Sequence, residues 1–299
     1  MSFTGPPMSP SSKLATGPHE FTTPSGAVLS YFVTGHGPHV LVNIAPGWGP
    51  ASVVYQNSFG FLDDLFTFVH LEVRGTRRST FPPDLRDMSS WHMAEDVEAL
   101  RMYLDLDALD VAGHSNGACI AQWFAIRFPT RVRRLVLVGA QLIGAGSVAG
   151  PAMNAILDAR PDQEHVRAFR NYDPSSLQTD DDFAAALGSF LPLYVANPER
   201  DFAKLTAAFT NKPQLACRKA QSKAESQHAN QADLVSSVPA RTLVIVGKED
   251  FICPLPVSQM IVDRVTDSIL YVVEDAGHFT WIEKPEEFRA ALSGFYGAK

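Results

Sequence analysis

The chain has 299 residues, of which 45% are hydrophobic and 19% are charged, and its formal net charge is −7 at pH 7. This length and composition are typical of a large globular α/β domain, or of a core domain that carries an inserted subdomain. The acidic balance argues against a nucleic-acid partner, which favours a basic face, and no apolar run is long enough to span a membrane.

The cysteines and the first residues bear on the cellular compartment. Three scattered cysteines are too few for a disulfide framework or a zinc site, and they suit a reducing compartment. Residues 1–20 are rich in Pro, Ser and Gly and contain no hydrophobic segment typical of a signal peptide, so we expect a flexible leader. These features predict a cytoplasmic protein, and no motif indicates a metal or another cofactor.

Strand and helix patterns alternate along two parts of the chain. The expected strands are residues 27–34, 39–44, 66–73, 109–112, 134–138, 241–246 and 269–273. Amphipathic or apolar helical patterns separate most of them, for example in residues 93–104. Such alternation implies a mostly parallel, doubly wound sheet with right-handed crossovers.

Residues 141–236 interrupt this alternation. They are helical and irregular in pattern, with several Gly, Asn and Asp breakers and no run typical of a buried parallel strand. We expect a helical lid inserted between two halves of the core, residues 21–140 and 237–299. A few of the lid's aromatic residues are expected to line an apolar pocket, and the rest to form the lid core: Phe169, Tyr172, Phe183, Phe190, Tyr194, Phe202 and Phe209.

Residues 113–117 read Gly-His-Ser-Asn-Gly, a G-x-S-x-G match between a strand pattern and an apolar helix pattern. In that context the motif predicts a nucleophile elbow, in which small flanking residues permit a strained turn. The following helix directs N–H groups and the positive end of its dipole at a developing oxyanion. We therefore predict Ser115 as the nucleophile, the alternative being a chance Gly-Ser-Gly turn.

A serine hydroxyl is a poor nucleophile unless a general base accepts its proton and a carboxylate orients that base. In an architecture of this kind the acid and then the histidine follow the serine, each at the end of a strand. Asp250 and His278 both follow predicted strands and complete the predicted triad. Glu249 and Asp275 are rival acids at the same strand ends.

An acyl-transfer site also needs donors for the oxyanion. We predict the backbone N–H of Asn116 and that of Trp48, which lies in a Gly-containing loop after the first strongly apolar strand. Gly47, Trp48 and His114 are candidates for contact with substrate. The indole of Trp48 either lines the pocket or covers the core, and His114 either packs or makes a local hydrogen bond.

Three arginines make a basic turn close in sequence to the strand ends: Arg74, Arg77 and Arg78. They either meet an anionic substrate or form a solvated turn with one structural ion pair. The second interpretation is favoured, because charge clusters of this kind usually form a solvated face.

On these motifs the chain resembles the α/β-hydrolase superfamily from about residue 21 to its end. The elbow, Asp250 and His278 occupy the family's three catalytic places in order, and residues 74–79 look like its R-G-x-G-x-S segment. The resemblance implies an α/β-hydrolase fold and hydrolytic chemistry at Ser115.

More narrowly, residues 46–50 and the elbow are similar to proline-iminopeptidase-like serine hydrolases. That group commonly shows H-G-G-P-G and G-x-S-W-G, whereas this chain has Ala-Pro-Gly-Trp-Gly and Gly-His-Ser-Asn-Gly. Pro46 replaces a histidine, and Arg77 replaces a glycine of the basic turn. The peptidase activity is therefore not carried over.

We predict a serine hydrolase that cleaves a small, fairly apolar ester, lactone or amide through an acyl-enzyme. Cofactor-free oxygenases and carbon–carbon bond-cleaving enzymes resemble the same scaffold, and a non-enzymatic small-molecule receptor is also compatible with it. Some oxygenases place the acid after an earlier strand, and its absence from residues 139–141 favours the hydrolase. Ser115 argues against dehalogenases and epoxide hydrolases, which need an aspartate nucleophile. The sequence predicts a small-molecule substrate and leaves monomer or homodimer open.

Overall fold

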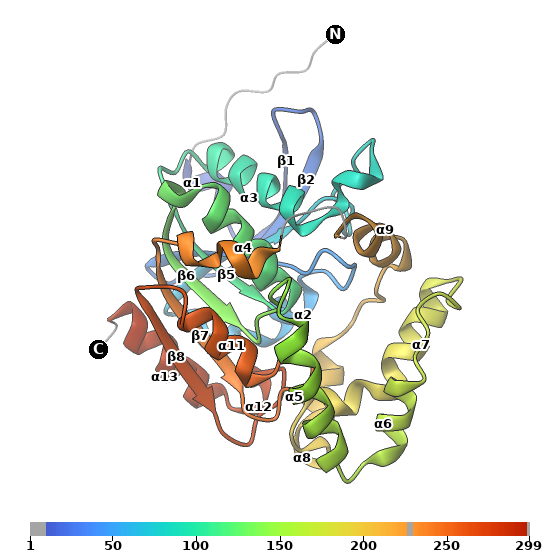
Figure 1. Ribbon diagram of the computed structural model, residues 1–299. Coiled ribbons are helices and arrows are strands. Elements are labelled where there is room, and N and C mark those ends of the chain that lie inside the picture. Colours follow the sequence, from blue (N-terminus) through green and yellow to red (C-terminus); the bar gives the residue numbers. More distant parts are fainter. Residues whose placement is uncertain (1–9, 226–229, 298–299) are drawn as a thin grey trace.

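Runs of apolar and β-branched residues form one eight-stranded sheet (Figure 1). A computed structural model describes residues 10–225 and 230–297. The strands lie in the order β1-β2-β4-β3-β5-β6-β7-β8, with β1–β2 and β2–β4 antiparallel and the other neighbours parallel. The predicted mostly parallel sheet is therefore confirmed. The strand bounds are β1 Gly17–Thr22, β2 Val28–Gly35, β3 His39–Ile44, β4 Phe66–Glu72, β5 Leu109–His114, β6 Val132–Val138, β7 Arg241–Gly247 and β8 Ser268–Val273.

The central strands are buried on both faces, as their near-continuous apolar runs predict. All six residues of β5 are buried, and successive side chains of a strand point to opposite faces. Val111 packs into the hydrophobic cluster on one face, and Ala112 packs into the cluster on the other. The sheet therefore lies between two layers of helices, as a doubly wound fold requires.

Helix α3 (Ser90–Leu104) begins at a capping serine, because the Ser89 side chain accepts a hydrogen bond from the His92 N–H. It ends at Asp105, which adopts the left-handed conformation with φ of 59°. The residues that the sequence places on one helical face are all buried against the sheet: Met93, Val97, Leu100 and Leu104.

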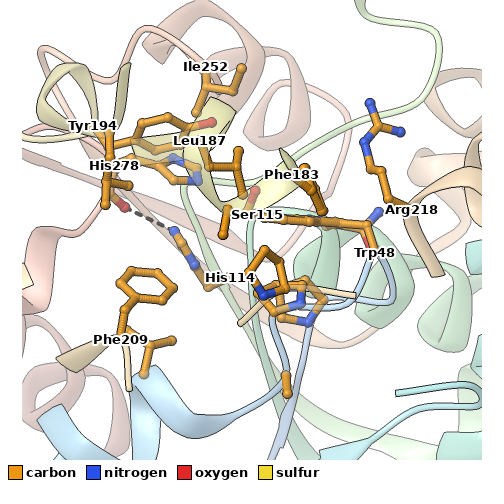
Figure 2. A pocket seen from close by; sticks show the side chains of 18 of the residues that line it. Trp48, His114, Ser115, Phe183, Leu187, Tyr194, Phe209, Arg218, Ile252 and His278 are labelled. Atoms are coloured by element: carbon orange, nitrogen blue, oxygen red, sulfur yellow. Dashed lines mark hydrogen bonds between the residues drawn. The ribbon is translucent and has the colours of Figure 1, made fainter. Parts of the chain in front are cut away.

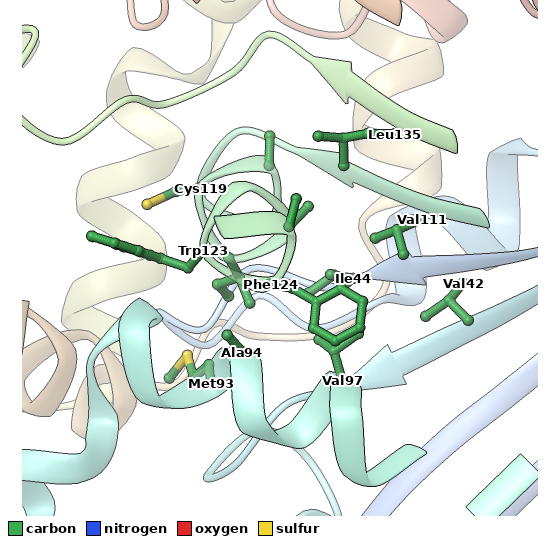
Figure 3. Close-up of a cluster of buried hydrophobic side chains, with 14 of the residues drawn as sticks. Val42, Ile44, Met93, Ala94, Val97, Val111, Cys119, Trp123, Phe124 and Leu135 are labelled. Carbon is green, nitrogen blue, oxygen red and sulfur yellow. The ribbon is translucent and has the colours of Figure 1, made fainter. Parts of the chain in front are cut away.

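Helix α4 (Asn116–Arg127) follows Ser115 directly and packs against α3. Ten of its 12 residues are buried, so it is the central helix of its layer. Trp123 and Phe124 fill the space between α4 and its neighbours (Figure 3). This burial fixes the position of the helix N-terminus, where Ser115 lies.

The other helical layer contains α2 (Val53–Ser58), α12 (Thr280–Glu283) and α13 (Pro285–Tyr296). The Trp281 indole N–H donates to the Ser58 hydroxyl at 2.8 Å and joins α12 to α2. Helix α11 (Leu255–Val262) packs with the first layer through its buried side chains.

Residues 141–236, called the insertion below, form helices between β6 and β7. Within its described residues there is no strand. Helices α6 and α7, yellow in Figure 1, lie away from the sheet. The helices that begin within it are α5 Gly146–Ala159, α6 Gln163–Arg170, α7 Asp180–Phe190, α8 Pro198–Ala208, α9 Leu215–Glu225, α10 Gln231–Leu234, and the 3₁₀ helices Leu191–Tyr194 and Val235–Ser237.

The expected leader of residues 1–20 needs a correction. Residues 1–9 lie outside the described residues, but Pro10–Lys13 form the short helix α1 and Gly17–Thr22 form β1. Strand β1 pairs along its whole length with β2, at the edge of the sheet. The Gly-Pro start and the half-exposed side chains hid this strand, because an edge strand needs no continuous apolar run.

Candidate active site

The turn between β5 and α4 has the shape that the elbow motif predicts. Ser115 has a φ of 56° and a ψ of −120°, a conformation that costs a non-glycine residue about 1–3 kcal/mol. A Cβ atom on Gly113 would lie 2.3 Å from the Gly117 carbonyl oxygen, and one on Gly117 would lie 2.2 Å from the Ile44 carbonyl oxygen. The two glycines are therefore required by close backbone packing around Ser115.

Asp250 and His278 meet at the ends of the neighbouring strands β7 and β8. The Asp250 Oδ2 lies 2.7 Å from the His278 Nδ1, and both side chains are buried. The other carboxylate oxygen, Oδ1, accepts the N–H groups of Ile252 and Cys253 at 3.0 and 2.9 Å. Because a carboxylate can only accept, Nδ1 carries the imidazole proton and leaves Nε2 as the free base.

The rival acids of the sequence analysis are engaged elsewhere. Glu249 accepts the Ala276 N–H at 3.0 Å. Asp275 pairs at the surface with Arg200 and Lys284. Neither side chain contacts His278, so Asp250 is the acid that the geometry associates with the histidine.

Ser115 and His278 both line one cavity (Figure 2). Among the described residues, no hydrogen bond joins the Ser115 hydroxyl to the His278 ring. Such catalytic hydrogen bonds often tighten only when substrate binds. Burial raises the pKa of the neighbouring Cys253 thiol well above its usual value, and the negative Asp250 adds to the shift. Cys253 is therefore a neutral thiol beside Ser115.

The backbone around Ser115 offers two N–H groups to an oxyanion. Asn116 is the first residue of α4, and the first N–H groups of a helix have no partner inside the helix. The Trp48 N–H donates to no other residue within the described ranges. Gly47, in contrast, donates its N–H to the Asn116 Oδ1 at 2.9 Å and is not among the residues that line the cavity.

The side chain of Asn116 has a bracing role that the sequence analysis missed. Besides the Gly47 N–H, its Oδ1 accepts the Gln221 side chain at 3.0 Å, and its Nδ2 donates to the Gln141 Oε1 at 3.1 Å. One amide thus ties the elbow to the Trp48 loop and to two residues of the insertion. A pattern search could not find this role, because the partners are far apart in sequence.

His114 lines the cavity, but both of its ring nitrogens are already used. Its Nε2 lies 3.0 Å from the His278 carbonyl oxygen, which can only accept, so Nε2 is the donor. The Tyr55 hydroxyl then donates to Nδ1 at 3.1 Å. Burial and the nearby His278 lower the pKa of His114 well below its usual range, so it stays neutral. Its hydrogen bonds support the backbone of His278 from within the core.

The cavity has a volume of about 830 Å³ and lies between the strand ends and the insertion. Trp48 forms part of its wall and packs edge-on against Phe183 of the insertion. Six of the seven aromatic residues singled out in the insertion line it, Phe202 being the exception. The other lining residues of the insertion include Arg218, Gln221 and Glu225, which no motif marked.

The three arginines of the basic turn do not line this cavity. Arg74 pairs with the buried Asp96 at 2.7 Å, and Arg78 pairs with Glu20 at 2.9 Å. Arg77 has a φ of 47° and donates its N–H to the Gln214 Oε1. A left-handed φ favours glycine, the residue that the R-G-x-G-x-S segment of the resembled family has at this position.

Two further properties of the described residues bear on the site. They contain no group of three or more His, Cys, Asp or Glu side chains that could hold a metal ion. In the same ranges, no helix combines the length and the apolar character needed to cross a membrane.

Comparisons with known proteins give a consistent relationship. A family profile described as "alpha/beta hydrolase fold" matches residues 40–285. The chain is 28% identical over 214 residues to a 2-hydroxy-6-oxo-2,4-heptadienoate hydrolase of Pseudomonas putida, and this match covers 71% of this chain and 71% of that relative. It is 22% identical over 264 residues to a probable proline iminopeptidase of Leptolyngbya boryana, over 81% of each chain. The structure of an esterase from Exiguobacterium antarcticum superposes with a TM-score of 0.72 at 17% identity, over 95% of this chain and all of the esterase.

Proposed function

Because the chain belongs to the alpha/beta-hydrolase fold family and is a hydrolase, we propose that it is a serine hydrolase that acts through an acyl-enzyme on Ser115. The substrate is a small, fairly apolar ester, lactone or amide. The observation that carries the proposal is Ser115, strained at the elbow, sharing a mainly apolar cavity with a histidine that is hydrogen-bonded to a buried aspartate.

The reaction follows from this geometry. The Ser115 oxygen attacks the substrate carbonyl while His278 Nε2 accepts the hydroxyl proton, and Asp250 stabilises the resulting imidazolium. The N–H groups of Asn116 and Trp48 bind the oxyanion, each such donor contributing about 3 kcal/mol in comparable sites. His278 then protonates the leaving group, and a water that it deprotonates releases the acyl group from Ser115.

The insertion acts as a lid in this proposal. Its aromatic side chains enclose the apolar part of the substrate and exclude water, which strengthens the electrostatic interactions at the oxyanion. Phe183 and Tyr194 lie on opposite sides of Ser115 in the view of Figure 2, so the insertion closes the site from more than one direction.

A panel of p-nitrophenyl esters of increasing acyl length tests the proposal. We expect turnover of short and medium chains and a loss of about 10⁴-fold or more in kcat for Ser115→Ala. Ser222→Ala is the matched control, since Ser222 lies on the insertion side of the cavity, and it should retain activity within a few-fold. Absence of turnover across the panel, with an unreactive Ser115, would favour a small-molecule receptor.

A second candidate function is hydrolysis of a carbon–carbon bond in a carboxylate substrate. The specific observation is Arg218, which lines the otherwise mainly apolar cavity and contacts Ser222 without a carboxylate partner in the described residues. The other cation of the lining, Lys212, is paired with Asp181. The relative from Pseudomonas putida is named for a dienoate, a carboxylate of the kind that a guanidinium binds.

The two candidates are separated by one comparison of substrates. Wild-type protein and Arg218→Met are assayed with 2-hydroxy-6-oxo-2,4-heptadienoate and with the neutral p-nitrophenyl butyrate. Carbon–carbon hydrolysis predicts turnover of the dienoate with a KM about 10-fold or more higher in the variant, and partial recovery in Arg218→Lys. Turnover of the butyrate alone, unchanged by the substitution, supports the ester or lactone substrate.

A further inference from the structure

The loop that carries His278 is held from outside by the insertion. The His278 N–H donates to the Tyr194 carbonyl oxygen at 2.8 Å, across a sequence separation of 84 residues. A Cβ on Gly277 would lie 2.6 Å from that same oxygen and 3.1 Å from the Ala196 nitrogen. The close approach of the two backbones therefore depends on glycine at position 277.

Glu283 bonds to both sides of this junction. Its Oε2 accepts the Ala196 N–H at 2.8 Å, and both of its oxygens accept the Gly277 N–H at 2.9 and 3.0 Å. The side chain is only 5% exposed. One buried carboxylate thus satisfies an N–H group of the insertion and an N–H group of the residue next to His278.

The backbone of His278 is consequently fixed in two opposite directions. Tyr194 of the insertion holds its N–H, and His114 of the core holds its carbonyl oxygen. Asp250 orients only the ring. The position of the ring therefore depends on the insertion as well as on the strand ends.

Burying a carboxylate at this position is energetically unfavourable by itself. Removing a charge from water costs several kcal/mol unless its hydrogen bonds compensate, and an amide or an apolar residue would avoid that cost. Asp201, the charged neighbour that adds to the cost, is itself paired with Arg200 and Lys204. A carboxylate accepts hydrogen bonds with both of its oxygens, whereas an amide would place an NH₂ donor 2.9 Å from the Gly277 N–H, where the Oε1 of Glu283 now accepts.

We propose that Glu283 is a positioning residue that couples the insertion to the general base: His278 reaches its working position only while residues 194–196 are docked on its loop through the Glu283 carboxylate. The inference rests on the proposed function of Ser115 and His278. It assigns the insertion a part in catalysis beyond enclosing the substrate.

The test compares Glu283→Gln with Glu287→Gln, an exposed control on the first turn of α13. The amide keeps the size of the side chain but accepts with one oxygen only. We expect kcat on the best ester to fall about 10- to 100-fold with KM within about three-fold, while the control stays at the wild-type value. Circular dichroism and thermal unfolding show that both variants are folded at the assay temperature.

A second readout follows the histidine itself. The proton between His278 Nδ1 and Asp250 should give a low-field NMR resonance in wild type, which we expect to shift or broaden in Glu283→Gln and in Gly277→Ala. Gly277→Ala separates the same two segments without altering the carboxylate, so both variants should lose kcat.

A folded Glu283→Gln variant with wild-type kcat and an unchanged resonance would overturn the inference. If wild-type protein neither turns over esters nor labels at Ser115, the proposed function fails, but the resonance still reports whether Glu283 positions His278. The two failures are therefore distinguishable.

Discussion

The strand ends and the insertion build the same cavity by different means. At the strand ends, Ser115, Asp250 and His278 are positioned by β5, β7 and β8, whose side chains pack into the two hydrophobic clusters on either face of the sheet. The insertion instead contributes side chains from helices with small clusters of their own. We propose that the first region carries the chemistry, and that the second one adapts it to a substrate and holds the general base in place.

After Ser115→Ala, the largest expected effect comes from a substitution that alters the strand-end region alone. Asp250→Asn should lower kcat by about 10³- to 10⁴-fold on the best ester, because an amide no longer stabilises the imidazolium and favours the wrong tautomer. Glu249→Gln serves as the control and should remain within a few-fold of wild type. Steady-state kinetics of the two variants measure both losses. A larger loss of kcat in Glu249→Gln would assign the role of the acid to Glu249.

The two regions were not equally predictable from the sequence. The G-x-S-x-G motif and the alternation of strands and helices are local patterns. They therefore predicted the mostly parallel sheet and the strand ends at which Ser115, Asp250 and His278 lie. The edge strand β1 was missed because its residues carry little apolar pattern.

The remaining contacts of the site escaped prediction for a physical reason. The bonds of Asn116 to Gln221 and of Glu283 to Ala196 join residues that are 87 or more positions apart. No local pattern marks such pairs, because their meeting depends on how the insertion packs on the core. No sequence pattern marked Arg218 either, because its neighbours in the cavity come from other elements.

The second prediction concerns the junction of the two regions. Burial raises the pKa of Glu283 to about 7, from an ordinary value of 4.5. The folded state therefore binds this proton more tightly than the unfolded state, and the resulting stability is fully present below pH 4.5 and is lost as the pH rises through about 7.

Relative to Glu283→Gln, wild-type protein should accordingly lose about 3 kcal/mol of unfolding free energy between acid pH and about pH 8. Chemical unfolding of both proteins across this range measures the difference, and the other titrating groups cancel between them. Parallel pH dependence of the two proteins would show that the carboxylate is not buried as described.

A smaller effect is expected where one side chain connects the two regions. In Asn116→Ala the Gly47 N–H loses its acceptor, and the loop with Trp48 loses its tie to the elbow. We expect kcat to fall about 10-fold, because the oxyanion donor is less well placed. Gln141→Leu removes only the partner of the Asn116 Nδ2 and should have a weaker effect. Equal losses in both variants would argue that the Gly47 bond is unimportant.

The smallest effect is expected at the C-terminal end of α3, away from the cavity. Asp105 is exposed and ends α3 with a φ of 59°, a conformation that glycine adopts without strain. Asp105→Gly should raise the unfolding free energy by about 0.5 to 1 kcal/mol and leave kcat unchanged. A change in kcat would show that the helix end and the site are coupled.

The role of Ser115 as the nucleophile is tested most directly by covalent labelling of the folded protein with a fluorophosphonate, followed by intact-mass and peptide mass spectrometry. We expect one phosphonyl group per chain, located on Ser115, with none on Ser115→Ala and slower labelling of Asp250→Asn. A folded wild-type protein that stays unlabelled, or that is labelled at another residue, would contradict the assignment of Ser115 as the nucleophile.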